Sequence, residues 1–327
     1  MKLSVLKPSF DDAAILLALL VLCVVGWLQI TSRLHVFSKN KGTSFQTCEN
    51  PRGIAFDGAH IWVACRHANS VQEFNVSDCR LLRTITDPVN LASPENLVFD
   101  GQNIWVSNSS VNRGMLTRVR TSDGAMLGTY AVGSGPYGMV FDGASIWVAN
   151  YKSNDLSKVN ASTGLVTNNI RLERCHLPSA LGFDGSHIWV NCGRDKAVEE
   201  LDLNGAPLRT VGVDSNPYNF TFDGANMWVV NVTGNSVTKI SATPTNSCPN
   251  PPCVVGTYPV GIHPQGIVFD GKYIWVSNLY ENSLTKLSAS DGRVVEEITG
   301  VSSPGLIVFD GGNLWISEAP ANRIFKF

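Results

Sequence analysis

Seven prolines in this chain are each followed by a different kind of side chain, and this pattern is typical of a binding surface. Each proline stands five residues before the phenylalanine of a repeated phrase, so the seven prolines occupy equivalent backbone positions. Variable side chains on a constant scaffold are a usual means of ligand specificity. The residues that follow the prolines are Arg52, Glu95, Tyr137, Ser179, Tyr218, Gln265 and Gly305.

A second set of charged and aromatic residues comes a few positions after the tryptophan of several copies. If the copies form a ring, both sets fall on one face, around the mouth of the central channel. The alternative interpretation is the ordinary variation of a solvated surface. The predicted ligand-binding residues from the two sets are Arg52, Glu95, Tyr137, Tyr218, Gln265, Arg66, Lys152, Arg194 and Tyr280.

Fewer residues of the sequence support a catalytic function than support ligand binding. The six histidines show no metal-ligand spacing, and no Ser/His/Asp or paired-carboxylate pattern stands out, so we predict neither a metal nor another cofactor. A competing hypothesis is a metal-assisted lyase or lactonase-like hydrolase at the same face, and only this alternative calls for a divalent cation. Its catalytic residues would be Glu95, Glu318, His67 and Tyr218. A third hypothesis is a structural protein of the cell surface.

The cysteines indicate the compartment. Cys48 and Cys65 are 17 residues apart, and so are Cys175 and Cys192; both pairs stand eight residues before and nine after their phenylalanine. Two residues that occur together in two copies, and in no other copy, are predicted to be bonded. Cys248–Cys253 is the third predicted disulfide, and Cys79 is left over. Three disulfides predict an oxidising, extracytoplasmic location, periplasmic or extracellular.

The repeated phrase itself is Phe-Asp-Gly, two variable residues, an apolar residue and Trp. Its seven copies are separated by 43, 42, 42, 39, 47 and 40 residues, which is the length of a four-stranded propeller blade. We interpret the Phe and Trp side chains as core and the Asp as an acceptor of backbone N–H groups in a tight turn. The copies begin at Phe56, Phe99, Phe141, Phe183, Phe222, Phe269 and Phe309.

The fold prediction is therefore an all-β, seven-bladed β-propeller of antiparallel blades. In the sixth copy the predicted strands are 266–269, 273–277, 283–288 and 293–298. The last copy supplies only three strands before the chain ends, and residues 43–48 stand where a preceding fourth strand would stand. We predict that this N-terminal strand closes the ring and removes an exposed edge.

The N-terminal segment differs in composition from the repeats. Residues 13–30 are nearly uncharged and apolar, at the lower length limit for crossing a bilayer, and no Ala-x-Ala site follows them. We predict a tail at 1–12, an uncleaved signal anchor or transmembrane helix at 13–31, a linker at 32–42 and the propeller at 43–327. A cleaved signal peptide is the alternative.

Charge and repeat structure limit the partners. Beyond residue 41 the chain has 20 basic and 25 acidic residues, which does not favour nucleic acid. Because one array accounts for all seven repeats, we predict a monomeric propeller. The predicted partners are the membrane, through the N-terminal helix, and an unidentified protein or small molecule at the channel mouth.

Several repeats resemble known families. Trp-Val-Ser-Asn at 105–108 and 275–278 and Trp-Val-Ala-Asn at 147–150 resemble the YVTN/NHL-like repeats of bacterial propellers. Residues 264–271 with Ile274-Trp275 are similar to blades of the streptogramin (virginiamycin B) lyase family. The resemblance covers 43–327 and implies a seven-bladed propeller.

That lyase family is known for histidines after the proline and for glutamates that hold magnesium. Here none of the seven residues after the prolines is a histidine, His263 precedes its proline, and only Glu95 and Glu318 stand for acidic members. The leading hypothesis is therefore a membrane-anchored propeller that binds a ligand or a protein partner without catalysis.

Overall fold

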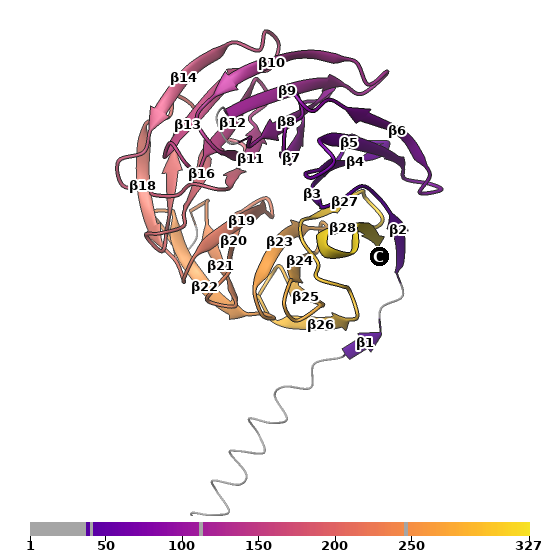
Figure 1. The fold of residues 1–327 in the computed structure, drawn as a ribbon. Coiled ribbons are helices and arrows are strands. Elements are labelled where there is room, and N and C mark those ends of the chain that lie inside the picture. Colours follow the sequence, from indigo (N-terminus) through magenta and orange to yellow (C-terminus); the bar gives the residue numbers. More distant parts are fainter. Residues whose placement is uncertain (1–36, 40–41, 111–113, 245–247) are drawn as a thin grey trace, which may run out of the picture. The chain divides into compact units, whose positions relative to one another are not determined.

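The structure is a computed structural model that describes residues 37–39, 42–110, 114–244 and 248–327. The described residues form seven antiparallel sheets arranged around a central axis, which confirms the predicted all-β, seven-bladed propeller (Figure 1). No helix among them is long and apolar enough to cross a membrane. The predicted tail and the predicted anchor at 13–31 lie outside the described residues.

Each blade takes its four strands in order from the centre of the ring to its rim. Blade 1 consists of β3 (Pro51–Phe56), β4 (His60–Cys65), β5 (Ser70–Asn75) and β6 (Leu81–Thr86), and blade 2 of β7 (Pro94–Phe99), β8 (Asn103–Asn108), β9 (Gly114–Arg120) and β10 (Met126–Val132). Blade 3 consists of β11 (Pro136–Phe141), β12 (Ser145–Asn150), β13 (Asp155–Asn160) and β14 (Val166–Arg171), and blade 4 of β15 (Leu181–Phe183), β16 (Ile188–Cys192), β17 (Ala197–Leu201) and β18 (Pro207–Gly212). Blade 5 consists of β19 (Pro217–Phe222), β20 (Asn226–Asn231), β21 (Ser236–Ser241) and β22 (Cys253–Pro259), and blade 6 of β23 (Pro264–Phe269), β24 (Tyr273–Asn278), β25 (Ser283–Ser288) and β26 (Val294–Thr299). Blade 7 consists of β27 (Ile307–Phe309), β28 (Leu314–Glu318), β29 (Arg323–Lys326) and β2 (Thr43–Gln46), with a 3-10 turn η1 (Ala319–Ala321) between β28 and β29.

The ring closes as the sequence predicts. Strand β2 pairs antiparallel with β29, from Thr43 opposite Lys326 to Gln46 opposite Arg323. One further strand, β1 (Phe37–Lys39), pairs parallel with β26 at the outer edge of blade 6, in a segment that the sequence assigns to a linker. Its pairing satisfies backbone groups of β26 that an unpaired edge would leave exposed.

The repeated Asp has a second function besides the turn. In blade 1, Asp57 Oδ1 accepts the backbone N–H groups of Ala59 and His60 at 2.8 and 2.6 Å. Its other oxygen, Oδ2, accepts the indole N–H of Trp62 at 2.7 Å. The structural interpretation of the Asp is thus confirmed, and the bond to Trp explains why the two residues keep a spacing of five. The equivalent Asp–Trp distances are 2.6–2.9 Å in the other six blades.

The tryptophans form the core between blades. Trp62 is fully buried and packs with Leu97 and Ile104 of blade 2, and Trp315 packs with Ile61 and Val63 of blade 1 across the closure. The seven phenylalanines are only half-buried, less than expected, because each ends its strand beside an exposed Asp-Gly turn. The aromatic core is therefore confirmed for Trp and is weaker for Phe.

All three predicted disulfides are present: Cys48–Cys65, Cys175–Cys192 and Cys248–Cys253. Cys65 and Cys192 end the second strands of blades 1 and 4 and join them to the loops before their first strands. Cys79 is unpaired and partly buried, and burial raises the pKa of its thiol. The disulfides agree with an oxidising environment.

Candidate functional site

The loops that lead into the first strands hold the variable residues, and each is attached to the preceding blade. The Asn282 side chain, from the turn after β24, accepts the backbone N–H of Ser303 at 2.8 Å, next to Pro304. Equivalent bonds hold the residue before the proline in four other blades. This repeated contact fixes the backbone that carries the channel-mouth residues. Its other members are Asn69–Ser93, Asn154–Leu177, Asn235–His263 and Asn322–Asn50.

Five predicted ligand-binding residues meet in one cavity at the channel mouth. The cavity has a volume of about 210 Å³ and is surrounded by the inner strands β3, β7, β11, β19, β23 and β27, whose labels encircle the centre of Figure 1. Blade 7 contributes Gly305 and Ser317 to the lining. The five predicted residues are Arg52, Glu95, Tyr137, Tyr218 and Gln265, and the lining also includes Asn50, Leu279, Ser303 and Pro320, which the sequence did not single out.

Glu95 is the most unusual residue of this cavity. Its side chain is 2 % exposed; Oε1 lies 3.0 Å from Arg66 Nε and accepts the Ser109 hydroxyl at 2.7 Å. Its other oxygen, Oε2, is buried and has no hydrogen-bond partner among the described residues. An unsatisfied buried carboxylate oxygen costs on the order of 1–3 kcal/mol, so it is a strong acceptor for a ligand donor.

Arg52 provides the opposite charge. Its Nε is buried and has no hydrogen-bond partner among the described residues. A guanidinium recognises carboxylates, phosphates and other acceptors through such N–H groups. The buried Oδ1 of Asn50, another lining residue, also has no hydrogen-bond partner among the described residues, so the cavity offers two unsatisfied acceptors and one unsatisfied donor.

Two tyrosines occupy the far side of the mouth. Tyr218 donates its hydroxyl to Tyr137 at 3.0 Å, although the two residues belong to blades 5 and 3. Their ring centroids are 6.3 Å apart, and Ser179 of the intervening blade 4 accepts the side-chain amide N–H of Asn191 and is not part of the cavity lining. Burial, together with the neighbouring Tyr137, raises the pKa of Tyr218 well above its usual range, so the phenol stays neutral.

The remaining predicted residues lie outside the cavity lining. Arg66 stands behind Glu95 as its ion-pair partner. Lys152 and Arg194 are exposed on their loops. Tyr280 is 66 % exposed and stacks on His263, with the ring centroids 4.2 Å apart. The exposed His67 lies 3.6 Å from Glu49. Its Nε2 lies 3.5 Å from Nδ2 of Asn50, which lines the cavity.

Glu318 has a structural environment. Its Oε1 accepts the backbone N–H of Ser302 at 2.8 Å, and its Oε2 lies 3.1 Å from Arg323 Nε. It occupies the position three residues after the blade tryptophan, where other blades join their second strand to nearby backbone or side chains. Four blades do so through an Asn amide and two through a disulfide cysteine. The equivalent residues are Cys65, Asn108, Asn150, Cys192, Asn231 and Asn278.

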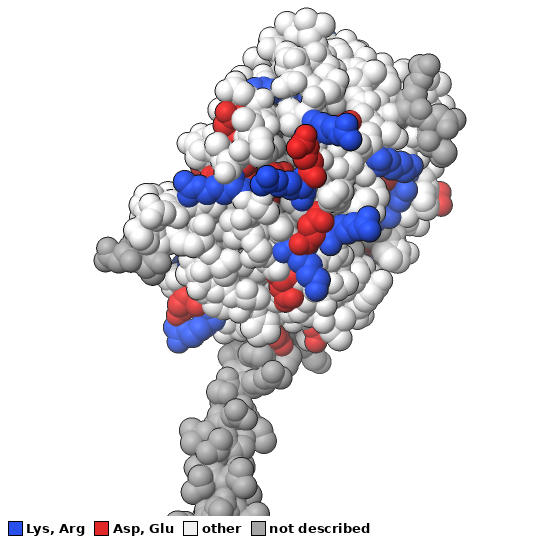
Figure 2. Space-filling view, turned by 90° about the vertical axis from the view of Figure 1, so that its left-hand side faces the viewer, with Lys and Arg blue, Asp and Glu red and all other residues white. Residues whose placement is uncertain are grey.

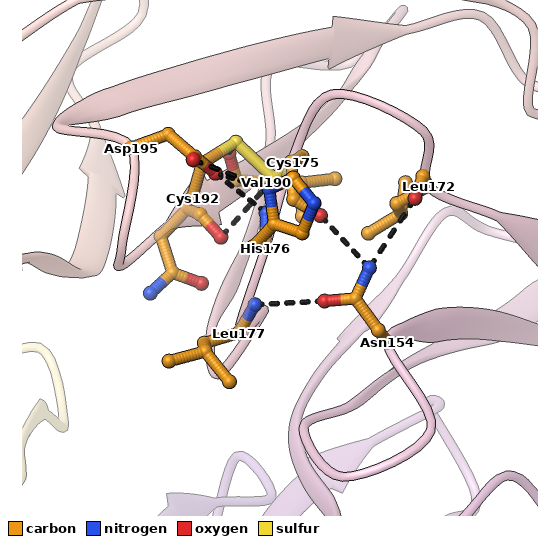
Figure 3. A network of polar contacts seen from close by, with 9 residues as sticks. Asn154, Leu172, Cys175, His176, Leu177, Val190, Cys192 and Asp195 are labelled. Atoms are coloured by element: carbon orange, nitrogen blue, oxygen red, sulfur yellow. Dashed lines mark hydrogen bonds and ion pairs between the residues drawn. A yellow bond between two sulfur atoms is a disulfide. The ribbon is translucent and has the colours of Figure 1, made fainter.

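The loop of blade 4 shows how closely this face is held. Asn154 from blade 3 donates to the carbonyl groups of Leu172 and Cys175 at 3.2 Å each, beside the Cys175–Cys192 disulfide (Figure 3). On the same loop, His176 Nδ1 lies 3.0 Å from Asp195 Oδ2. Disulfide, amide and ion pair together fix the loop that leads to Ser179.

A larger cavity of about 560 Å³ lies at the rim, between β14 and β18. It contains none of the predicted site residues, and its walls include Arg174, Glu199 and Arg209. Figure 2, which views the molecule from the left-hand side of Figure 1, shows Lys and Arg interspersed with Asp and Glu. We take the channel-mouth cavity as the candidate site because unsatisfied groups of both charges line it.

Comparison with solved structures supports the same architecture. A catalytically inactive histidine-to-alanine variant of virginiamycin B lyase from Staphylococcus aureus, solved with quinupristin, matches with a TM-score of 0.74 and 19 % identity over 88 % of this chain and 98 % of that chain. A streptogramin B lyase matches with a TM-score of 0.73 and 18 % identity, over 87 % and 96 %.

A chain of the Kuenenia stuttgartiensis hydrazine synthase matches equally well, with a TM-score of 0.72 and 16 % identity over 89 % of this chain and 99 % of that chain. No family model matches, and no curated protein matches. The chain is therefore a seven-bladed β-propeller that is structurally similar to the streptogramin B lyases, and at these identities the likeness establishes the fold alone.

Proposed function

We propose that this protein binds a small polar ligand in the channel-mouth cavity. The observation that carries the proposal is the pair of buried, unsatisfied groups that line it, Glu95 Oε2 and Arg52 Nε. Burial of such groups costs stability, and a ligand with one donor and one acceptor would recover that cost on binding. Tyr137, Tyr218 and Gln265 complete the lining as further polar contacts.

The size of the cavity favours a small molecule over a protein segment. Its volume of about 210 Å³ is below the range of roughly 300–1,000 Å³ that is typical of sites for drug-sized ligands. The exposed Lys152, Arg194 and Tyr280 lie outside the cavity, so its volume does not limit the size of what they contact. They would bind a larger ligand or a partner protein.

Binding without catalysis remains our proposal. Of the four residues in the enzyme hypothesis, Glu95 and Tyr218 line the cavity. His67 is exposed beside the lining residue Asn50, and Glu318 is bonded to Ser302 and Arg323. The neutral phenol of Tyr218 is already donated to Tyr137. The histidine replaced in the inactive lyase belongs to that protein, and the described lining of this cavity contains none.

We also propose the location of the protein. The apolar segment at 13–31 would serve as an uncleaved anchor, with residues 43–327 as a monomeric propeller on the extracytoplasmic side. The three disulfides support the oxidising compartment. The apolar composition of 13–30 supports the anchor.

A thermal-shift screen of the full-length protein against small polar metabolites, with and without chelator, tests the binding. A ligand at 100 times its Kd stabilises the folded state by about 2.7 kcal/mol, which is readily measured. We expect a shift that Glu95→Gln abolishes and that chelator leaves unchanged.

Glu318→Gln is the matched control, because Glu318 is an equally buried glutamate paired with an arginine but lies outside the cavity. This variant should lower the stability of the protein without lowering its affinity for the ligand. The proposal is wrong if the Glu95→Gln variant binds every metabolite found in the screen as tightly as the unmodified protein does. It is also wrong if no metabolite shifts the melting temperature, and that result would favour the structural-protein hypothesis. Turnover of a hit would establish the enzyme hypothesis instead.

A further inference from the structure

Blades 1 and 4 differ from the other five blades at two further equivalent positions. His60 and His187 stand four residues after the blade phenylalanine, where the other blades have Asn, Ser or Tyr. Glu73 and Glu200 lie directly opposite Trp62 and Trp189 on the neighbouring strand. The other five blades have a cation at the second position. These residues are Arg118, Lys158, Lys239, Lys286 and Lys326.

The cation has a defined environment in those five blades. It lies over the ring of the blade tryptophan, at 4.6–5.4 Å from the centroid. In four of them it also donates to a turn carbonyl of the next blade, as Lys239 does to Ala289. Blades 1 and 4 therefore replace a built-in positive charge by a buried acid.

The replacement creates a three-residue cluster in each of the two blades. His60 Nδ1 lies 3.3 Å from Asp57 Oδ2 and 3.3 Å from Glu73 Oε1. In blade 4 the corresponding distances, from His187 to Asp184 and Glu200, are again 3.3 and 3.3 Å. In both clusters the three donor atoms lie within 4.8 Å of one another.

These distances match the ligand shell of a tetrahedral metal ion. Zinc binds imidazole nitrogen and carboxylate oxygen at about 2.0–2.2 Å, which places tetrahedral ligand atoms roughly 3.3–3.6 Å apart. A charge-assisted N–H···O bond is shorter, at about 2.7–2.9 Å. The two histidine–carboxylate distances in each blade are therefore those of ligands around a common ion, and they are longer than those of a protonated histidine held by two carboxylates.

The environment of the glutamate points the same way. Glu73 is 1 % exposed, and neither of its oxygens accepts a hydrogen bond from any residue that the structure describes. Arg83 Nε approaches Oε2 at 2.5 Å and leaves Oε1 directed to His60. A cation at Oε1 would relieve the cost of this burial.

The other two ligands are oriented and reachable. Asp57 is held by the bonds to two backbone amides and Trp62, and partners of this kind fix ligand geometry in metal sites. The imidazoles of His60 and His187 are 31 % and 36 % exposed, which gives an ion access from solvent. None of the six residues lines the channel-mouth cavity.

We propose that blades 1 and 4 each bind one divalent transition-metal ion of the zinc class. The ligands are His Nδ1, Asp Oδ2 and Glu Oε1, with water as the fourth ligand. Imidazole with carboxylate ligands suits zinc, cobalt and nickel better than the hard cations magnesium and calcium. The protein thus binds two equivalents per chain, at the end of the blades opposite the channel mouth.

The test is a titration of the full-length protein, purified without a histidine tag and stripped with chelator. Calorimetry with zinc should give two equivalents, and cobalt should give the intense visible absorption of a tetrahedral site. Magnesium at the same concentration should give no heat. Absence of zinc binding, or cobalt spectra of octahedral type only, would overturn the proposal.

His60→Asn and His187→Asn are the decisive variants. Asn occupies this position in blades 2, 5 and 7, where Asn103, for example, donates to Asp100, so the fold tolerates it. Each single variant should lose one equivalent, with at least a tenfold loss of affinity, and the double variant should lose both. Glu73→Gln should repeat the result of His60→Asn if the latter perturbs folding.

His176→Asn is the matched control. His176 is also a histidine beside an aspartate (Figure 3), but among the described residues it belongs to no group of three possible ligands. It should retain two equivalents. Retention of both equivalents in the double His60→Asn, His187→Asn variant would show that zinc binds elsewhere and that the clusters are ion-pair networks.

Discussion

At the scale of single residues, Glu199 on β17 is a buried carboxylate with a defined effect on stability. Its side chain is 4 % exposed and lines the rim cavity. Burial raises its pKa, and the nearby Arg174 only partly offsets this. Because the folded state holds the proton more tightly than the unfolded state, the stability of the protein falls as pH rises from about the ordinary value of 4.5 through the raised pKa.

We therefore predict that Glu199→Gln makes the protein more stable at pH 7, and that this advantage disappears as pH falls towards 4. Urea unfolding at a series of pH values measures the difference. Glu173→Gln, an exposed glutamate of the same cavity, should show no such trend. An advantage of Glu199→Gln that is constant with pH would contradict the assignment.

At the scale of elements, the asparagines that bridge neighbouring blades determine the position of the mouth loops. Asn282 has a left-handed backbone, with φ of 56°, and its side chain accepts the N–H of Ser303, which lines the cavity. The same element thus links a turn of blade 6 to the leading loop of blade 7.

Asn282→Gly keeps the left-handed backbone at little cost but removes the acceptor. We predict a loss of about 0.5–1.5 kcal/mol in the free energy of unfolding, together with faster amide exchange at 301–305 and weaker ligand binding. Asn282→Asp keeps an acceptor oxygen and should recover most of the loss. If the Gly and Asp variants behave alike, the side-chain bond does not position the loop.

At the scale of the whole molecule, closure depends on a short strand far from the C-terminus in sequence. β2 pairs with β29, and Phe45 packs against Trp315 with 6.4 Å between ring centroids. A propeller that lacks this strand has an unpaired outer edge in blade 7, and such edges pair with other chains.

Two truncations separate closure from the rest of the N-terminus. Removal of residues 1–41 leaves β2 intact and uncovers the edge of β26 only along the three residues that pair with β1, so it should change the melting temperature much less than the second truncation. Removal of residues 1–46 should lower the melting temperature by several degrees and produce concentration-dependent aggregation, measured by light scattering. Equal stability of the two truncated proteins would show that β2 is dispensable.

The sequence alone determined the architecture. Seven copies of one phrase, with the same turn, the same buried tryptophan and the same spacing, require seven equivalent environments, and only a closed ring of blades supplies them. The missing fourth strand and the paired cysteines followed from comparison of the copies. These features were predictable because each depends on contacts within a blade or between adjacent strands. The YVTN/NHL-like repeat assignment stays a prediction.

The tertiary structure decided which variable residues meet. Tyr137 and Tyr218 belong to blades 3 and 5, and only the folded ring brings their hydroxyl groups together in the cavity. Glu318 was predicted as a catalytic candidate of the enzyme hypothesis, and the structure brings its carboxylate to Ser302 and Arg323, contacts that its place in the sequence did not indicate. Distances across the ring depend on side-chain lengths in several blades at once, and linear spacing contains no such information.

The same reason applies to the histidines. The sequence showed no metal-ligand spacing, because His60 lies three residues after Asp57 while Glu73 comes from the neighbouring strand. Comparison of the repeats shows that the histidine and the glutamate occur together in blades 1 and 4. Only the register of the neighbouring strands shows that both side chains meet the aspartate at one point. The repeat therefore determined the scaffold, and the packing of unlike side chains on it determined the candidate sites.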